Sequence, residues 1–114
     1  MHEYSLIQSL ISRAGEEARG HGATRIHSLS IRVGELSGVE PDLLTAAFEI
    51  ARQGTPCDGA ALRLTRIPAV WSCPRCGRVF AAGEVLRCAA CAAPAQLSDG
   101  ADALMLDSIE MEVP

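Results

Sequence analysis

Residues 73–91 read CPRCGRVFAAGEVLRCAAC, and this stretch decides how the rest of the chain is interpreted. It holds two Cys-x-x-Cys pairs, Cys73 with Cys76 and Cys88 with Cys91, separated by eleven residues. Each pair turns tightly enough to place two thiolates on one ion, and two pairs supply four sulfur ligands. Zn²⁺ suits such a set because it favours soft donors and has no d-electron preference for geometry. We therefore expect a closed, structural zinc site, with iron as the weaker alternative.

The cysteine-rich segment, residues 69–97, has few apolar side chains, so metal binding should supply most of its folding free energy. Gly77 suits the left-handed turn of the first knuckle, whereas the second pair is followed by Ala92 and Ala93. Two redox-active cysteine pairs are the alternative, but such pairs need a supporting helix N-terminus. Cys57 has no nearby partner and is expected to be a small buried or turn residue.

The segments on both sides of the cysteines show the periodicities of helices and strands. Spacings of three and four predict two helices, and alternation of apolar and polar residues predicts three strands. The predicted helices cover residues 4–19 and a segment from Pro41 to Gly54, and the predicted strands cover residues 24–34, 60–67 and 103–113. Because the last strand follows the cysteines, residues 69–97 are an excursion from one α/β domain formed by residues 1–68 and 98–114.

The last predicted strand changes its alternation part of the way along. Ile109 and Met111 fall on one parity, and Leu104 and Leu106 fall on the other. An extra residue in one strand of an antiparallel pair restores a common face, so we expect a bulge or twist near Asp107.

The composition of this chain of 114 residues argues against several classes of function. Its formal net charge is −4, which argues against nucleic acid as a partner because phosphate binding needs a basic face. Neither a bilayer-length apolar run nor a basic leader is present, so we expect a cytoplasmic protein without a membrane partner. No acid–base pair at an open metal position and no phosphate loop is visible, and we therefore expect no enzyme.

The first three residues, Met1-His2-Glu3, can chelate a metal ion. The α-amine of Met1, the backbone amide of His2 and its imidazole lie in chelating range, and Glu3 can add its amide nitrogen or carboxylate. Deprotonation of an amide requires an ion such as Ni²⁺ or Cu²⁺ that favours planar nitrogen donors. From the residue types alone, an incidental histidine in a frayed terminus is the competing interpretation. His21 and His27 are expected to be structural or solvated.

Taken together, these features resemble the HypA/HybF family of nickel metallochaperones for [NiFe]-hydrogenase maturation. The resemblance covers nearly the whole chain. It rests on Met1-His2-Glu3, Ser5-Leu6, Ile31-Arg32-Val33-Gly34-Glu35-Leu36-Ser37-Gly38-Val39-Glu40-Pro41, Gly54-Thr55-Pro56, Gly59-Ala60, the two cysteine pairs and Ser108-Ile109-Glu110. Two departures stand out, because Tyr4 occupies a position that is usually aliphatic and Ala92 one that is usually glycine.

The resemblance implies an α/β (α+β) fold in which two helices pack on a three-stranded sheet and a zinc ribbon projects from it. It implies Ni(II) as transient cargo at Met1, His2 and Glu3. It also implies structural Zn(II) at the four cysteines, which are Cys73, Cys76, Cys88 and Cys91. The expected partners are the maturation GTPase HypB, the hydrogenase large-subunit precursor and, in some members, urease accessory proteins. The chain itself is expected to be a monomer or a homodimer.

The main alternative is a zinc-ribbon adaptor that binds another macromolecule and delivers no metal. Nucleic acid is the commonest target of such ribbons, and the acidic balance of this chain argues against it. An extension of the N-terminus separates the two functions, because it should abolish chelation by the α-amine and leave an adaptor unaffected.

Overall fold

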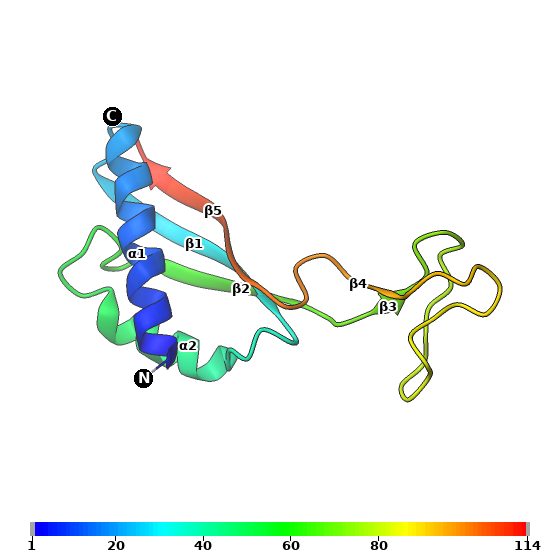
Figure 1. Cartoon of the computed structure of the whole chain (residues 1–114). Coiled ribbons are helices and arrows are strands. Elements are labelled where there is room, and N and C mark those ends of the chain that lie inside the picture. Colours follow the sequence, from blue (N-terminus) through cyan, green and yellow to red (C-terminus); the bar gives the residue numbers. More distant parts are fainter. Residues whose placement is uncertain (1, 114) are drawn as a thin grey trace.

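The computed structural model describes residues 2–113, and its elements follow the predicted order of helix, strand, helix, strand, insert and strand (Figure 1). The elements are α1 (His2–Gly20), β1 (Arg25–Gly34), α2 (Pro41–Ala51), β2 (Ala61–Ile67), β3 (Trp71–Ser72), β4 (Gln96–Leu97) and β5 (Leu104–Glu112). α1 begins two residues before its predicted start, so His2 and Glu3 are already helical. No helix in the described residues is long and apolar enough to cross a membrane.

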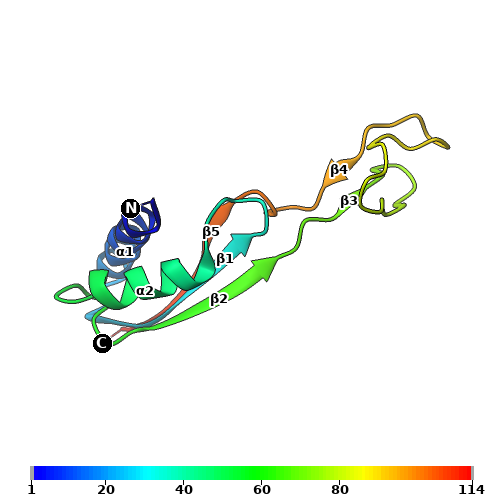
Figure 2. The ribbon, with the colours of Figure 1, turned by 90° about the horizontal axis from the view of Figure 1, so that it is seen from below.

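The larger sheet has the order β2-β1-β5, with β1 in the centre. β1 pairs in parallel with β2, which requires the crossover through α2, and antiparallel with β5. Both helices lie on the same face of this sheet (Figure 2). The predicted architecture of two helices on a three-stranded sheet is therefore confirmed.

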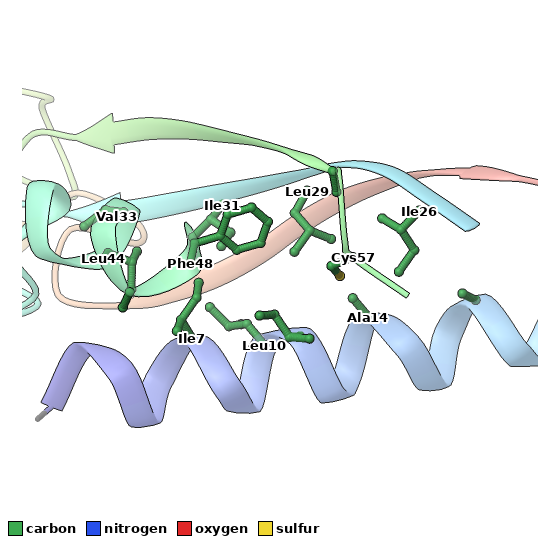
Figure 3. Packing of buried hydrophobic residues seen from close by; sticks show 14 residues of the cluster. Ile7, Leu10, Ala14, Ile26, Leu29, Ile31, Val33, Leu44, Phe48 and Cys57 are labelled. Atoms are coloured by element: carbon green, nitrogen blue, oxygen red, sulfur yellow. The ribbon is translucent and has the colours of Figure 1, made fainter. Parts of the chain in front are cut away.

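The core between helices and sheet consists almost entirely of aliphatic side chains, as a composition with 4% aromatic residues requires. Phe48 of α2 is completely buried at its centre, and Figure 3 shows it between β1 and the first turns of α1. Cys57 is also completely buried in this cluster, which confirms the expectation for it. The buried residues of the cluster are Ile7, Leu10, Ile11, Ala14, Ala18, Ile26, Leu29, Ile31, Val33, Leu44, Ala47, Phe48, Cys57 and Ala60.

The predicted irregularity in β5 is a bulge at Asp107. Ser30 of β1 pairs with Ser108 and Ile31 pairs with Leu106, so Asp107 has no residue opposite it. β1 has a second irregularity at His27, which lies between two paired residues and is exposed. Each bulge inserts one residue, and apolar side chains on both sides of it therefore reach the same core.

The cysteine-rich segment extends away from the helices and gives the molecule its elongated shape (Figures 1 and 2). The radius of gyration is 17.9 Å, against ~13 Å for a compact domain of this length. A second, separate buried cluster of Cys73, Phe80, Cys88 and Ala93 holds this end together. Two segments connect the cysteine-rich segment to the larger sheet, and Ser98 joins them. Its hydroxyl donates to the Pro68 carbonyl at 2.8 Å and accepts from the Val70 N–H at 3.0 Å.

Candidate metal centres

The four predicted zinc ligands lie together at the end of the insert. All four cysteine Sγ atoms lie within 4.8 Å of one another. Cys76 Sγ and Cys88 Sγ, which belong to different pairs, are 3.9 Å apart. Four sulfurs bound at ~2.3 Å to one tetrahedral Zn²⁺ would be ~3.8 Å apart, so the sulfur cluster fits this ion.

Both knuckles have the same backbone conformation despite their different sequences. The N–H of Gly77 donates to the Cys73 carbonyl at 2.9 Å, and the N–H of Ala92 donates to the Cys88 carbonyl at 2.7 Å. Gly77 has φ 78° and Ala92 has φ 56°. Ala92 is the only non-glycine residue with positive φ in residues 2–113, and it therefore adopts a conformation that L-residues avoid. The second Cys-x-x-Cys turn therefore has the conformation of the first without a glycine at this position.

Hydrogen bonds prepare the sulfur cluster for a cation. Backbone N–H groups, first that of Cys76 and then that of Arg75, lower the pKa of Cys73 to about 6. The neighbouring sulfurs, first that of Cys73 and then that of Cys76, raise the pKa of Cys91 to about 12. The raised pKa keeps Cys91 protonated among the neighbouring sulfurs, and a bound divalent ion would displace that proton.

Aromatic side chains support the cluster from one side. Phe80 is buried beside the cysteines, and its N–H donates to the Trp71 carbonyl at 2.9 Å. The guanidinium of Arg78 covers the Phe80 ring with 4.5 Å from its central carbon to the ring centroid, and it also pairs with Glu84. This small core is far too limited to fold the segment alone, which agrees with a metal as its main source of stability.

The second predicted centre is at the start of α1, in the helix-and-sheet domain and away from the cysteines (Figure 1). Met1 lies outside the described residues, and His2, the first described residue of α1, is exposed. The first four N–H groups of a helix have no partner within it. The amide nitrogens of His2 and Glu3 are therefore not occupied by the hydrogen bonds of α1.

Glu3 has a structural contact that its sequence position does not indicate. Its side chain is buried, and its Oε2 accepts a hydrogen bond from the backbone N–H of Glu40 at 3.3 Å. The N–H of Glu3 itself, and then that of Glu40, lower the pKa of this carboxyl group. Glu40 is the residue before α2, so the Glu3 carboxylate also faces the positive end of that helix dipole. The carboxylate thus joins the starts of the two helices, and Glu40 is a site neighbour that sequence reasoning missed.

Within the described residues, the other two histidines contact neither of the two candidate metal centres. His21 Nδ1 lies 2.9 Å from the Glu17 carbonyl at the end of α1. His27 Nε2 lies 3.4 Å from Glu112 Oε1 on the open face of the sheet. Both side chains are exposed, as expected.

A family model described as "Hydrogenase/urease nickel incorporation, metallochaperone, hypA" matches residues 1–111. The hydrogenase maturation factor HypA of Deinococcus radiodurans is 45% identical over 95 residues, which cover 82% of this chain and 79% of the relative. The corresponding protein of Chloroflexus aurantiacus is 33% identical over the full length of both chains.

Two solved structures share this fold over nearly the whole chain. The solution structure of the Ni metallochaperone HypA from Helicobacter pylori aligns with a TM-score of 0.71 at 27% identity, covering 98% of both chains. A second solution structure of a HypA protein aligns with a TM-score of 0.75 at 30% identity and covers 100% of this chain and 98% of that one.

Proposed function

The chain belongs to the HypA family of metallochaperones for nickel incorporation, and from this premise we propose that it binds Ni(II) at its own N-terminus. It carries this ion as cargo during the maturation of [NiFe]-hydrogenase, and urease is a second recipient at the level of the family. The observation that carries the proposal is the match of the family model from residue 1, which includes Met1-His2-Glu3.

The donor set that we propose is nitrogen-rich and planar. The α-amine of Met1 and the amide and imidazole nitrogens of His2 supply three donors, and the amide of Glu3 supplies the fourth. Ni²⁺ favours this tetragonal arrangement, whereas Zn²⁺ favours the tetrahedral sulfur set of the ribbon. The Glu3 carboxylate is already bonded to the Glu40 N–H, and it serves to hold the terminus in position instead of binding the ion.

Exposure of the terminus suits a protein that must release its cargo. His2 is exposed, so a receiving protein can approach the ion from one edge and exchange ligands. Protonation of the imidazole or of the amide nitrogen weakens the same site. The buried Glu3 side chain meanwhile keeps the chelating residues attached to the rigid core.

The four cysteines hold the resident metal. Zn²⁺, bound by Cys73, Cys76, Cys88 and Cys91, supplies structural stabilisation with no open position for a substrate. We divide the chain accordingly into a nickel-binding domain of residues 1–68 and 98–114 and a zinc ribbon of residues 69–97. Two separate buried clusters support this division.

The protein acts with the hydrogenase maturation machinery. More specifically, we propose the HypB-like GTPase and the hydrogenase large-subunit precursor as its partners, in the cytoplasm. We also propose that it catalyses no reaction, because delivery requires only binding and ligand exchange.

The test is nickel binding by calorimetry and absorption on zinc-loaded protein with its native N-terminus. The native protein should bind one equivalent of Ni²⁺ and show the d–d absorption band of a square-planar complex. A version whose N-terminus is extended by a few residues should bind Ni²⁺ poorly. His2→Ala should lose nickel and keep zinc, whereas His21→Ala, an exposed histidine in the turn directly after α1 that serves as the control, should keep both. Stoichiometric nickel binding by the His2→Ala variant would contradict the proposed site. Absence of nickel binding by the native form would favour the zinc-ribbon adaptor.

A further inference from the structure

Helix α2 has apolar side chains on two faces. Its inner face, formed by Leu44, Ala47 and Phe48, is buried in the core. Its outer face carries Leu43, Ala46 and Ile50, and all three side chains are exposed, with 47% of Leu43 and 63% of Ile50 accessible to solvent. We call these three residues the outer stripe of α2.

The spacing of the outer stripe makes it a continuous surface. Residues at positions i, i+3 and i+7 follow one side of a helix. Figures 1 and 2 show α1 and the sheet beside α2, and no other segment of the described chain covers its remaining side. Single exposed apolar residues are ordinary, but a helix that is apolar on two faces is typical of one that packs on two sides.

The charges around the outer stripe are predominantly negative. Asp42 and Glu49 flank it, and α2 contains no basic residue. Glu40 lies directly before the helix. Arg52, directly after it, is engaged on Glu49 Oε2 at 2.9 Å and on the Ala60 carbonyl at 2.8 Å. A complementary surface is therefore apolar in the centre and bordered by lysine or arginine.

The same charges disfavour a second copy of this chain. If two α2 helices packed antiparallel through their outer stripes, Asp42 of one copy would approach Glu49 of the other. If they packed parallel, each acid would approach its own counterpart. Like charges at an interface oppose association, so charge complementarity favours a different protein with a basic rim.

The outer stripe is also connected to the N-terminus. The hydrogen bond from the Glu40 N–H to Glu3 holds the start of α2 against the start of α1, where His2 is exposed. A protein bound along α2 therefore lies beside the residues that we propose as nickel ligands. An apolar helix face in a partner's groove is also a common mode of recognition between proteins.

We infer that the outer stripe of α2 is the docking surface for the protein that exchanges nickel with this chain, and that this partner presents an apolar groove with a basic rim. The inference rests on the function proposed above. Leu43 and Ile50 fill the groove, Asp42 and Glu49 face the basic rim, and docking brings the partner's metal ligands to the N-terminus. The stripe supplies the desolvated centre of the interface, where most binding energy is concentrated.

The test measures binding of the full-length, zinc-loaded protein to the two partners proposed above, the purified GTPase and large-subunit precursor of the same organism. The double variant Leu43→Ser/Ile50→Ser should weaken binding to one of them at least tenfold. Ile50→Arg should weaken it more than Ile50→Glu, because only arginine opposes a basic rim. Val85→Arg is the matched control, since Val85 is 81% exposed on the ribbon and lies outside the stripe.

Four outcomes would overturn the inference. They are unchanged affinity of the serine double variant, equal effects of arginine and glutamate at position 50, no binding of the wild type to either partner, and self-association that the serine variant abolishes. Nickel stoichiometry is measured on every variant. If the serine variant still binds one equivalent of nickel, its weaker partner binding is due to lost docking and not to lost chelation. If the wild type binds no nickel, the proposed function is contradicted, but the comparison of partner affinities still tests the docking surface.

Discussion

The carboxylate of Glu35 accepts a hydrogen bond from the backbone N–H of Ala69 at 2.7 Å. Glu35 directly follows β1, and Ala69 begins the insert that carries the four cysteines. The residues on either side of Glu35 hold the returning chain, because the Gly34 N–H donates to the Ala103 carbonyl and the Leu36 N–H donates to the Ala101 carbonyl. The turn after β1 thus clamps both connections of the ribbon to the sheet.

Replacement of Glu35 by Ala should loosen this clamp. The Ala69 N–H would lose its charged acceptor, and its protection from hydrogen exchange should fall about fivefold, which corresponds to ~1 kcal/mol for a largely exposed bond. Glu35→Gln keeps an acceptor oxygen at the same position and serves as the control. Equal exchange rates at Ala69 in all three proteins would show that the contact does not hold the ribbon.

Gly34→Ala should destabilise the sheet domain by ~1–3 kcal/mol, the usual cost of overpacking. A Cβ atom at Gly34 would lie 2.3 Å from the carbonyl oxygen of Ala101, so the backbone of the returning chain must move. Urea unfolding followed by circular dichroism measures the change. Gly20→Ala is the control, because a Cβ there meets nothing within 4 Å. A Gly34→Ala variant as stable as this control would contradict the close approach.

Ala92→Gly should stabilise the zinc-loaded ribbon. Ala92 has φ 56°, and a left-handed conformation costs an L-residue ~1–2 kcal/mol, part of which is offset by the greater entropy of an unfolded glycine. A net gain of ~0.5–1 kcal/mol should appear as zinc affinity two- to fivefold higher in chelator competition. The reciprocal variant Gly77→Ala should lower the affinity. A shift in the same direction for both substitutions would exclude backbone strain as the cause.

Glu110 should contribute stability that is lost in acid. The Ser28 hydroxyl, which donates to its Oε1 at 2.5 Å, and then Arg63 lower the pKa of this carboxyl group. Because the folded pKa lies below the ordinary value of ~4.3, the contribution is complete above that pH. It disappears as the pH falls through the folded pKa.

Glu110→Gln should therefore lose less stability than the wild type between pH 7 and pH 3, as judged by the urea midpoint at each pH. Ser28→Ala removes the main hydrogen-bond donor to Glu110 and should likewise reduce the loss of stability between pH 7 and pH 3. An identical loss of stability in the wild type and in both variants would show that this contact does not contribute to the acid dependence.

Local pattern was sufficient for much of this fold. The alternation change between Leu106 and Ile109 predicted the bulge at Asp107, because side chains on opposite parities can share a core only if one residue is inserted. Cysteine spacing likewise predicted which four sulfurs meet. The bulge at His27 was not predicted in this way, because His27 shares the parity of Leu29 and no neighbouring residue indicates an inserted position.

By itself, the sequence determined the helices, the strands, the insertion of the cysteine-rich segment between β2 and β5 and the four sulfurs that meet, because each depends on side chains a few positions apart. Only the tertiary structure decided how these parts are joined. The contact of Glu3 with Glu40 spans 37 positions and that of Glu35 with Ala69 spans 34. A single acidic residue leaves no repeating pattern in the sequence, and its carboxylate meets an N–H donor only when the fold brings distant backbone beside it. No local sequence pattern can therefore predict such a contact.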